Sequence, residues 1–266
     1  MQERTSGSPQ SDAAMRVGGY DIDIVVQGYP GKTVCHGGLG WSTIALIRGH
    51  GRVALVDTGG FGVRPLLQTR LTQRGLRPED VTDLLLTHAH HDHMVNWTLF
   101  SHARIVIGAH ELAWAATEPW GRGPVPELYV RELQTWKTVH AVAEGEEVLP
   151  GMTVHLAPGH TPGHVLYVLK GTDHDVIFTG DAAKNRTELT CRRADASYDA
   201  AISTASLDAI WTIWRRRPGT IVVPGHDIPM VIKDGRATYL GKREAAIKSW
   251  FGDDLETTTT FELTLT

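Results

Sequence analysis

The sequence predicts a mixed α/β (α+β) protein in which strand-rich and helical segments alternate through two successive halves of the chain. Two observations support this class. Short apolar runs at strand spacing are separated by turns containing glycine or proline, and longer segments with helical spacing follow the strands. With 266 residues, of which 41% are hydrophobic and 21% charged, the chain has the length and composition of a globular protein with one substantial core.

The first half is predicted to begin with strands and to continue with a helix. Apolar residues alternate at strand spacing over residues 20–27, 42–48 and 52–57. The helix is expected over residues 63–74, with Leu66, Leu67 and Leu71 on its apolar side, and it should end at Gly75.

Strands and helices also alternate in the remainder of the chain. Strands are expected over residues 81–87, 104–108, 152–156, 175–178 and 220–223. A short helix is expected over residues 110–116, and the longest helix over residues 199–217, before Pro218. The apolar stripe of this long helix is formed by Ile202, Leu207, Ile210, Trp211 and Trp214.

The charge of the chain gives little attraction to polyanions. The net charge is −4, so nucleic acid is not an expected partner unless a local basic patch binds it. Arg215–Arg217 end the long helix, where cations complement the helix dipole. The more interesting basic group follows Asp181 and consists of Lys184, Arg186, Arg192 and Arg193.

The cysteines and the N-terminal segment predict a cytoplasmic protein. Cys35 and Cys191 are far apart and indicate no disulfide framework. Residues 1–15 are polar, are expected to be disordered, and lack the apolar core of a secretory signal. No segment approaches the length of a membrane span, so no membrane partner is expected.

Residues 88–93, His-Ala-His-His-Asp-His, directly follow a predicted buried strand and indicate a metal site. His88 and His90 are two residues apart and point the same way on an extended chain. Asp92 and His93 continue into a turn that can direct their donor atoms toward a second ion. Taken alone, this segment could also be a solvated histidine-rich loop.

Three further candidate ligands argue against that alternative. His160, Asp181 and His226 each follow a strand-like run and lie in a tight turn. A glycine precedes each of them, and glycine allows the backbone to turn sharply and to approach an ion closely. The repeated placement therefore predicts one site built from distant parts of the chain.

These motifs resemble those of the metallo-β-lactamase superfamily of hydrolases. The resemblance extends from residues 55–60 through residues 88–93, 158–160 and 180–181 to residues 224–226. Within that superfamily, residues 26–30, 56–60 and 76–81 are similar to the small animal metallo-β-lactamase-domain-containing proteins and their bacterial relatives. The resemblance implies a four-layer αββα sandwich with its ligands in loops at one edge.

Carried over by position, the resemblance implies a site for two divalent ions. The ligands of the first ion would be His88, His90 and His160. The ligands of the second ion would be Asp92, His93 and His226. Asp181 would bridge the two ions, and Asp57 would support the ligands by hydrogen bonding. His164, four residues after a candidate ligand, is expected to order the ligand loop, with substrate binding as the alternative.

The donor types favour zinc, although Mn²⁺, Fe²⁺ and Co²⁺ also suit a set rich in imidazole with two carboxylates. His90 stands where the oxygen-reducing di-iron branch of the superfamily has a glutamate, which favours hydrolysis. True β-lactamases lack the bridging aspartate that Asp181 supplies, so antibiotic cleavage is not expected as the main activity.

The expected reaction is the attack of a metal-bridging hydroxide on a carbonyl carbon whose oxygen one ion polarises. Asp92 and Asp181 are the candidate catalytic residues. Asp92 would transfer a proton to the leaving group, and Asp181 would hold the two ions at bridging distance.

The preferred substrate is a lactone, either a quorum signal or a catabolic lactone, because related intracellular lactonases share the complete ligand set. The alternatives are a thioester of the glyoxalase type, a phosphodiester or RNA, and another cyclic amide or ester. Lactonases usually have a tyrosine three residues after the bridging aspartate, where this chain has Lys184. Tyr129 or Tyr198 could replace it, or Lys184 could bind a substrate carboxylate. A protein that only binds a ligand is disfavoured because all seven ligand positions are filled.

A proline-rich segment is expected to provide contacts outside the metal motifs. Residues 117–129 are too rich in proline and glycine for regular structure and could overhang the site, with a plain surface connection as the alternative. The candidate contacts to a small-molecule substrate are Trp120, Tyr129, Lys184 and Arg186.

The predicted domain organisation is a single domain over residues 16–255 followed by a tail over residues 256–266. Alternating apolar residues in the tail predict an edge strand, with a frayed terminus as the alternative. Such a strand could pair with its own sheet or with that of a second subunit in a homo-oligomer.

Overall fold

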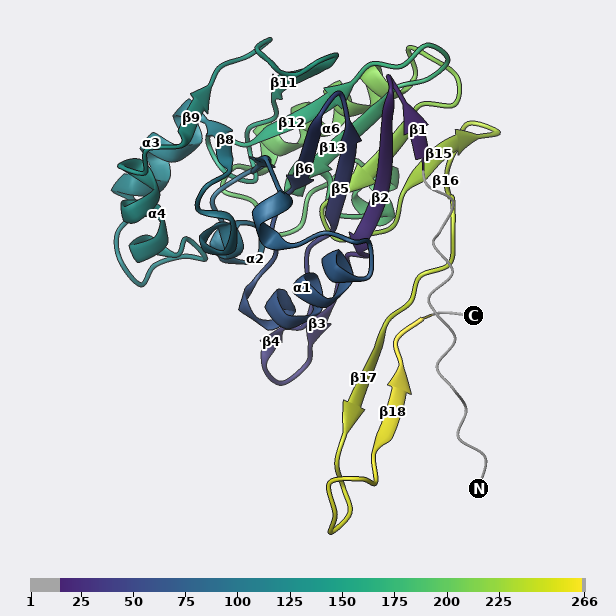
Figure 1. The fold of residues 1–266 in the computed structure, drawn as a ribbon. Helices are drawn as coiled ribbons and strands as arrows, with labels where there is room; N and C mark the ends of the chain where they lie inside the picture. Colours follow the sequence, from purple (N-terminus) through teal and green to yellow (C-terminus); the bar gives the residue numbers. More distant parts are fainter. Residues whose placement is uncertain (1–14, 265–266) are drawn as a thin grey trace.

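The computed structural model describes residues 15–264, and in this part of the chain two seven-stranded sheets pack face to face with helices outside each (Figure 1). The predicted αββα sandwich is therefore confirmed. Of the segment 1–15 that was expected to be disordered, residues 1–14 lie outside the described residues, and Met15 instead begins strand β1.

The first sheet contains strands from the N-terminal half of the chain. In spatial order they are β1 (Met15–Val17), β2 (Tyr20–Val26), β5 (Ile44–Gly49), β6 (Arg52–Val56), β7 (Asp83–Leu85), β8 (Arg104–Gly108) and β9 (Val139–Val142). The first four pair antiparallel, and β6 to β9 run parallel.

The second sheet follows in the C-terminal half. Its strands are β10 (Glu147–Leu149), β11 (Met152–Leu156), β12 (Val165–Leu169), β13 (Val176–Gly180), β14 (Ile221–Pro224), β15 (Met230–Lys233) and β16 (Arg236–Tyr239). Only β13 and β14 are parallel in this sheet. A small hairpin, β3 (Lys32–Thr33) with β4 (Gly37–Gly38), lies outside both sheets.

The helices connect these strands. They are α1 (Arg64–Thr72), α2 (His91–Met94), α3 (Ala109–Thr117), α4 (Glu127–Gln134), α5 (Arg186–Cys191) and α6 (Ala200–Trp214). Segments of 3-10 helix are η1 (Phe61–Val63), η2 (Pro78–Asp80), η3 (Val95–Phe100) and η4 (Asp181–Ala183).

Strand alternation divides the apolar side chains between the layers. On β7 and the residue after it, Leu84 and Leu86 face the helices while Leu85 faces the other sheet. On β13, Phe178 faces the first sheet while Ile177 packs under α6. Because both faces of these central strands are buried, their sequences are continuous apolar runs.

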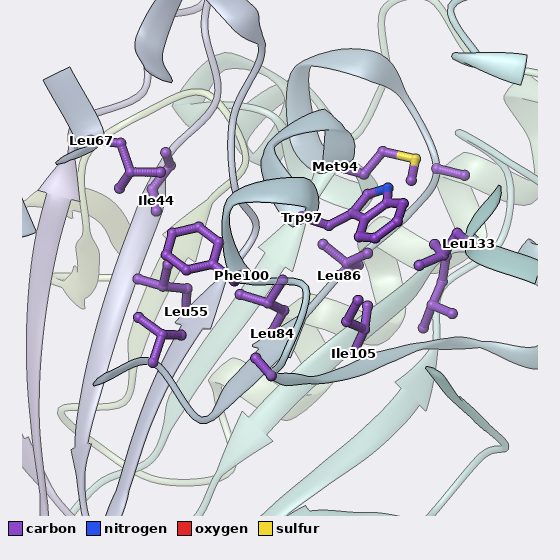
Figure 2. Close-up of a cluster of buried hydrophobic side chains, with 14 of the residues drawn as sticks. Ile44, Leu55, Leu67, Leu84, Leu86, Met94, Trp97, Phe100, Ile105 and Leu133 are labelled. Carbon is purple, nitrogen blue, oxygen red and sulfur yellow. The ribbon is translucent and has the colours of Figure 1, made fainter. Parts of the chain in front are cut away.

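The outer core of the first sheet packs against α1, α4 and η3. Figure 2 shows Leu67 of α1 close to Ile44, and Trp97 and Phe100 of η3 over the strand residues. Trp97 and Phe100 are buried to within 2% of their surface. This layer fixes the segment between β7 and β8, which carries the histidine-rich motif.

The strand ends bring the predicted ligands to one edge of the sandwich. Asp57 follows β6, the histidine-rich motif follows β7, and both strands run parallel. Asp181 and His226 follow the parallel pair β13 and β14 in the same way. Because carboxyl ends of parallel strands meet at one sheet edge, residues far apart in sequence gather there.

Two predicted helical faces were wrong by one position. Leu66 is 41% exposed, whereas Leu67 and Leu71, four residues apart, are fully buried. On α6 Ile202 is 45% exposed, because the buried face passes through Ser203 instead. In both helices the buried side chains are those that face the adjacent sheet, and they are three or four residues apart.

The predicted irregular segment 117–129 is regular at both ends. Thr117 ends α3, and Tyr129 lies in α4, which starts at Glu127 directly after Pro126. Proline is compatible with a helix start because the first amide groups of a helix have no partner inside it.

The C-terminal segment forms a strand, as predicted, but its partner is neither main sheet. Strand β18 (Thr259–Glu262) pairs antiparallel with β17 (Ala246–Ser249), and this hairpin projects from the body of the molecule (Figure 1). Residues 265 and 266 lie outside the described residues.

Leu67→Ala should destabilise the protein by roughly 2–5 kcal/mol, because it opens a cavity under the first sheet. Leu66→Ala, on the exposed side of the same helix, should cost less than about 1 kcal/mol. The free energies of unfolding from urea titrations measure both changes. Equal losses for the two variants would contradict the assignment of the buried face.

Candidate metal centre

Seven side chains from four loops converge at the edge of the sandwich. Their donor atoms form three groups in which all atoms lie within 4.8 Å of one another. The groups are His88, His90 and His160, then His88, His93 and Asp181, and then Asp92, His93 and His226. The sharing of His88 and His93 between groups makes this one continuous site, with space for more than one ion.

The Asp181 carboxylate lies between the groups. Its Oδ1 is 3.2 Å from Nε2 of His93 and 3.2 Å from Nε2 of His226. Its Oδ2 faces the opposite way and is 3.3 Å from Nε2 of His160. The two oxygens of one carboxylate therefore lie next to two different sets of imidazoles, as a bridging ligand requires.

The distances between imidazole nitrogens also fit metal binding. His90 Nδ1 is 2.9 Å from His160 Nε2, and His93 Nε2 is 3.2 Å from His226 Nε2. Tetrahedral zinc with bonds of 2.0–2.1 Å places neighbouring ligand atoms roughly 3.3 Å apart. The buried His88 Nε2 has no hydrogen-bond partner in the structure. An ion at the centre of each group would satisfy these nitrogens.

Asp57 holds the loops that carry these donors. Its Oδ2 accepts a hydrogen bond from His93 Nδ1 at 2.8 Å, which leaves Nε2 of that ring free to bind an ion. Its Oδ1 accepts from the backbone N–H of Thr87 at 2.8 Å. Asp57 has a φ of 56°, a left-handed conformation that is uncommon for non-glycine residues and that aspartate adopts more readily than most.

Two glycines are required by close backbone approach. A Cβ on Gly225 would lie 2.3 Å from Asp181 Oδ1, and one on Gly180 would lie 2.5 Å from Thr87 Oγ1. Gly180 also has a φ of 47°. Any larger residue at these positions would displace the carboxylate or its supporting loop, so the Gly-ligand pairs in the sequence have a direct steric cause.

His164 contacts two of the candidate ligands without being one itself. Its Nε2 accepts a hydrogen bond from the backbone N–H of Asp181 at 3.0 Å, and its ring stacks on that of His88 with 4.8 Å between centroids. Burial lowers the pKa of His164 to about 3, so the ring is neutral and can accept this bond.

Burial also keeps the imidazoles of the first group neutral. It lowers the pKa of His90 to about 4 and holds the pKa values of His88 and His160 well below the ordinary value. His160 Nδ1 donates to the carbonyl of Ala196 at 3.1 Å. Neutral rings fixed in this way present a free lone pair at the remaining nitrogen, which is the form that binds metal.

The second group is dominated by its carboxylates. Burial would lower the pKa of His93, but Asp181 and Asp92 together raise that pKa well above the ordinary value. Burial would raise the pKa of Asp181, but His226 and His93 together hold it well below its usual range. Two charged carboxylates, the buried Asp181 and the partly exposed Asp92, thus lie beside the same imidazoles, and this arrangement attracts a cation.

Glu111 connects two ligand-bearing loops and was missed by the sequence analysis. It is fully buried, and its carboxylate accepts hydrogen bonds from the N–H of Ala89 at 2.8 Å, from Thr161 Oγ1 at 2.7 Å and from the N–H of Gly163 at 3.1 Å. Burial raises its pKa to about 7. Its position four residues before the buried Ala115, on the apolar face of α3, was the available signal.

The proline-rich loop does approach the metal motif. The N–H of His91 donates to the carbonyl of Pro124 at 2.9 Å. Tyr129 contacts the ring of Phe61 edge-on at 5.4 Å. Phe61 follows Gly60, where an added Cβ would lie 3.5 Å from the Cα of Asp92. Trp120 is 60% exposed and lies under the Arg131 guanidinium.

The two basic candidates have other partners. Lys184 Nζ is 3.3 Å from Glu188 Oε1 and donates to the carbonyl of Asp195 at 2.5 Å, so its charge is already balanced. Arg186 Nε donates to the carbonyl of Ala237 at 2.8 Å. The Arg186 side chain thus points toward strand β16 rather than into the group of donors.

Two aromatic residues complete the surroundings. Trp114, which was not predicted as a site residue, lies edge-on to His90 with 6.5 Å between ring centroids. It also contacts Tyr198 at 6.0 Å, and the Tyr198 backbone N–H donates to the carbonyl of His160. Tyr198 is 68% exposed, so its hydroxyl is accessible beside the first group.

The sequence comparisons agree with this geometry. The model of the family described as metallo-beta-lactamase superfamily matches residues 37–226. Metallo-beta-lactamase domain-containing protein 1 of Xenopus laevis is 31% identical over 73% of this chain and 74% of its own length. An N-acyl homoserine lactonase of Bacillus cereus is 28% identical over 60% of this chain and 61% of its own length.

Solved structures share the fold at lower identity. AidC, a dizinc quorum-quenching lactonase in complex with a product, superposes with a TM-score of 0.68 at 17% identity, over 84% of this chain and 95% of that chain. An N-acyl homoserine lactone hydrolase with N-hexanoyl-L-homoserine at its metal centre gives 0.63 at 19% identity, over 80% and 95%. At these identities the similarity establishes the αββα fold alone.

Glu111→Ala should lower the free energy of unfolding by about 3 kcal/mol, because it removes three hydrogen bonds and leaves two buried N–H groups without acceptors. It should also weaken metal retention, since both loops it joins carry histidine donors. Urea unfolding and metal analysis after dialysis measure the two effects. Glu132→Ala, on the exposed side of α4, is the matched control, and a loss as large there would refute the role of Glu111.

Proposed function

The chain belongs to the metallo-β-lactamase superfamily, and we propose that it is a binuclear metal-dependent hydrolase that opens a lactone ring. The observation that carries this proposal is the Asp181 carboxylate, whose two oxygens face separate groups of imidazoles. A single-ion site would need no ligand with that arrangement.

We infer two sets of metal ligands. His88, His90 and His160 would hold the first ion. Asp92, His93 and His226 would hold the second. Asp181 would contact both. When bound, two divalent ions lower the pKa of water and polarise a substrate carbonyl, which is the chemistry that ester hydrolysis needs. Zinc suits this donor set best, with Mn²⁺, Fe²⁺ and Co²⁺ as alternatives.

Asp92 is the residue that we propose moves the proton. Its side chain is 26% exposed, whereas that of Asp181 is 5% exposed. Burial would raise the pKa of Asp92, but His93 and His226 lower it, so the carboxylate is ionised and can accept a proton. Because Asp92 reaches the open side of the site, it can pass that proton to a leaving oxygen.

A carbonyl substrate with an apolar part suits the surroundings of the donors. Trp114 lies edge-on to His90 and contacts Tyr198, while Phe61 and Tyr129 form a second aromatic pair. The Tyr198 hydroxyl is the candidate hydrogen-bond donor to the substrate carbonyl oxygen. In lactonases a tyrosine at the position of Lys184 usually has this role. Relatives named as N-acyl homoserine lactonases support the lactone class.

The expected partner is a small molecule. Among residues 15–264 no helix has the length and apolar character that crossing a membrane requires. Self-association through the C-terminal hairpin, and the division into one domain and a tail, stay predictions.

Protein purified without added metal should contain about two zinc or equivalent ions per chain by inductively coupled plasma analysis. Asp181→Ala should reduce this to about one or less, because it removes the ligand common to both ions. His140→Ala, which alters a surface histidine paired with Glu146, should change nothing. A wild-type content below about one ion would refute the binuclear site.

A substrate panel tests the lactone assignment. We expect N-acyl homoserine lactones or other lactones to be hydrolysed faster than a glutathione thioester, a cephalosporin and single-stranded RNA. Asp92→Asn should lower kcat for the best substrate by about 10²–10⁴-fold, the usual contribution of a general acid or base. Faster turnover of thioester or RNA would replace the lactone proposal, and undiminished turnover by Asp92→Asn would exclude its proton-transfer role.

A further inference from the structure

We propose that a pocket outside the second sheet binds a small anion carrying two or more phosphate groups. The pocket encloses roughly 410 Å³, and four arginines line it together with Thr190, Trp211, Gly235 and Ala237. The arginines are Arg186, Arg192, Arg215 and Arg236. We call this site the arginine pocket. None of the seven candidate metal ligands lines it, so the proposal is independent of the hydrolase function.

The arginines come from separate elements. Arg186 starts α5 and Arg192 follows its end in a left-handed conformation, with a φ of 56°. Arg215 follows the end of α6, and Arg236 starts β16 after the tight turn at Gly235. The convergence of these four cations is therefore a product of the tertiary fold and is not a basic run in the sequence.

The positive charge of the arginine pocket is only partly balanced. None of its lining residues within the described range 15–264 is acidic. Arg192 forms an ion pair with Asp208, whose side chain is 59% exposed. Among residues 15–264, Arg215 and Arg236 form no ion pair. Four neighbouring guanidinium groups repel one another, and an anion bound between them would remove this repulsion.

Trp211 holds two of the guanidinium groups in place. The Cζ atoms of Arg192 and Arg215 lie 4.7 Å and 4.6 Å from the centre of its ring, at cation–π distance. The indole is fixed, because its Nε1 donates to the carbonyl of Leu189 at 2.8 Å. Side chains ordered before binding lose less conformational entropy when a ligand arrives. Trp211 is only 6% exposed, so a base cannot stack on it.

This chemistry selects the ligand class. A planar guanidinium pairs with two phosphate oxygens at once, and four of them exceed the needs of a single phosphate. The volume of the arginine pocket is typical of small-ligand sites. Nucleic acid would need an extended basic surface, whereas this chain has a net charge of −4. The ligand is thus a short oligophosphate, either free or carried by a nucleotide.

Isothermal titration calorimetry of the metal-loaded protein with pyrophosphate, ATP and adenosine tests this site. We expect saturable binding of pyrophosphate, of ATP or of both, and none of adenosine. Arg215→Gln/Arg236→Gln should raise Kd at least about tenfold, since each charge-assisted pair contributes substantially. Neither arginine has an ion-pair partner in the described part of the chain, so the variant should keep its fold, which circular dichroism checks.

The matched control is Arg16→Gln/Arg122→Gln, which removes the same charge from exposed positions and should leave Kd within about twofold, the change expected of screened surface charges. Metal content is measured before and after each titration, so that extraction of the ions is not mistaken for binding. Binding of ATP alone identifies a nucleotide as the source of the phosphates, and binding of pyrophosphate identifies the phosphate chain itself. An unchanged Kd in the pocket variant, or the absence of saturable binding by both pyrophosphate and ATP, would overturn the proposal.

Discussion

The buried Asp181 carboxylate is the constraint around which the site is organised. One oxygen faces His93 and His226, and the other faces His160. Burial alone would favour the neutral acid, but the surrounding imidazoles hold its pKa well below the usual range. A charged group this deep in an apolar sandwich needs opposite charge close by, and two cations would provide it on both sides.

A few hydrogen bonds keep the ligand-bearing loops in register around this carboxylate. Asp57 connects Thr87 to His93, and Glu111 connects the loop of Ala89 to that of Thr161. Both carboxylates are buried and accept from backbone N–H groups, so they act as rigid supports. The loops can therefore present their donors with little motion, as a preorganised site requires.

Much of the fold could be predicted because the apolar periods are local properties of the chain. The central strands are buried on both faces, and their sequences are continuous apolar runs that need no tertiary information to recognise. The errors concern the buried faces of two helices and the first residue of a third. Leu66 and Ile202 were assigned to the buried side, and the start of α4 at Glu127 was missed. The side of a helix that is buried depends on the sheet against which it packs. The spacing of apolar residues alone does not identify that side.

The sequence by itself determined the types of donor, their order and the glycines that precede them, because ligand chemistry and backbone freedom belong to individual residues. Only the tertiary structure decided which oxygen of Asp181 faces which histidine, that Glu111 joins two loops, and that Arg186 lies with three other arginines. Those relations are distances between strands and helices remote in sequence. They are fixed by the packing of the two sheets, which brings the ends of parallel strands to one edge.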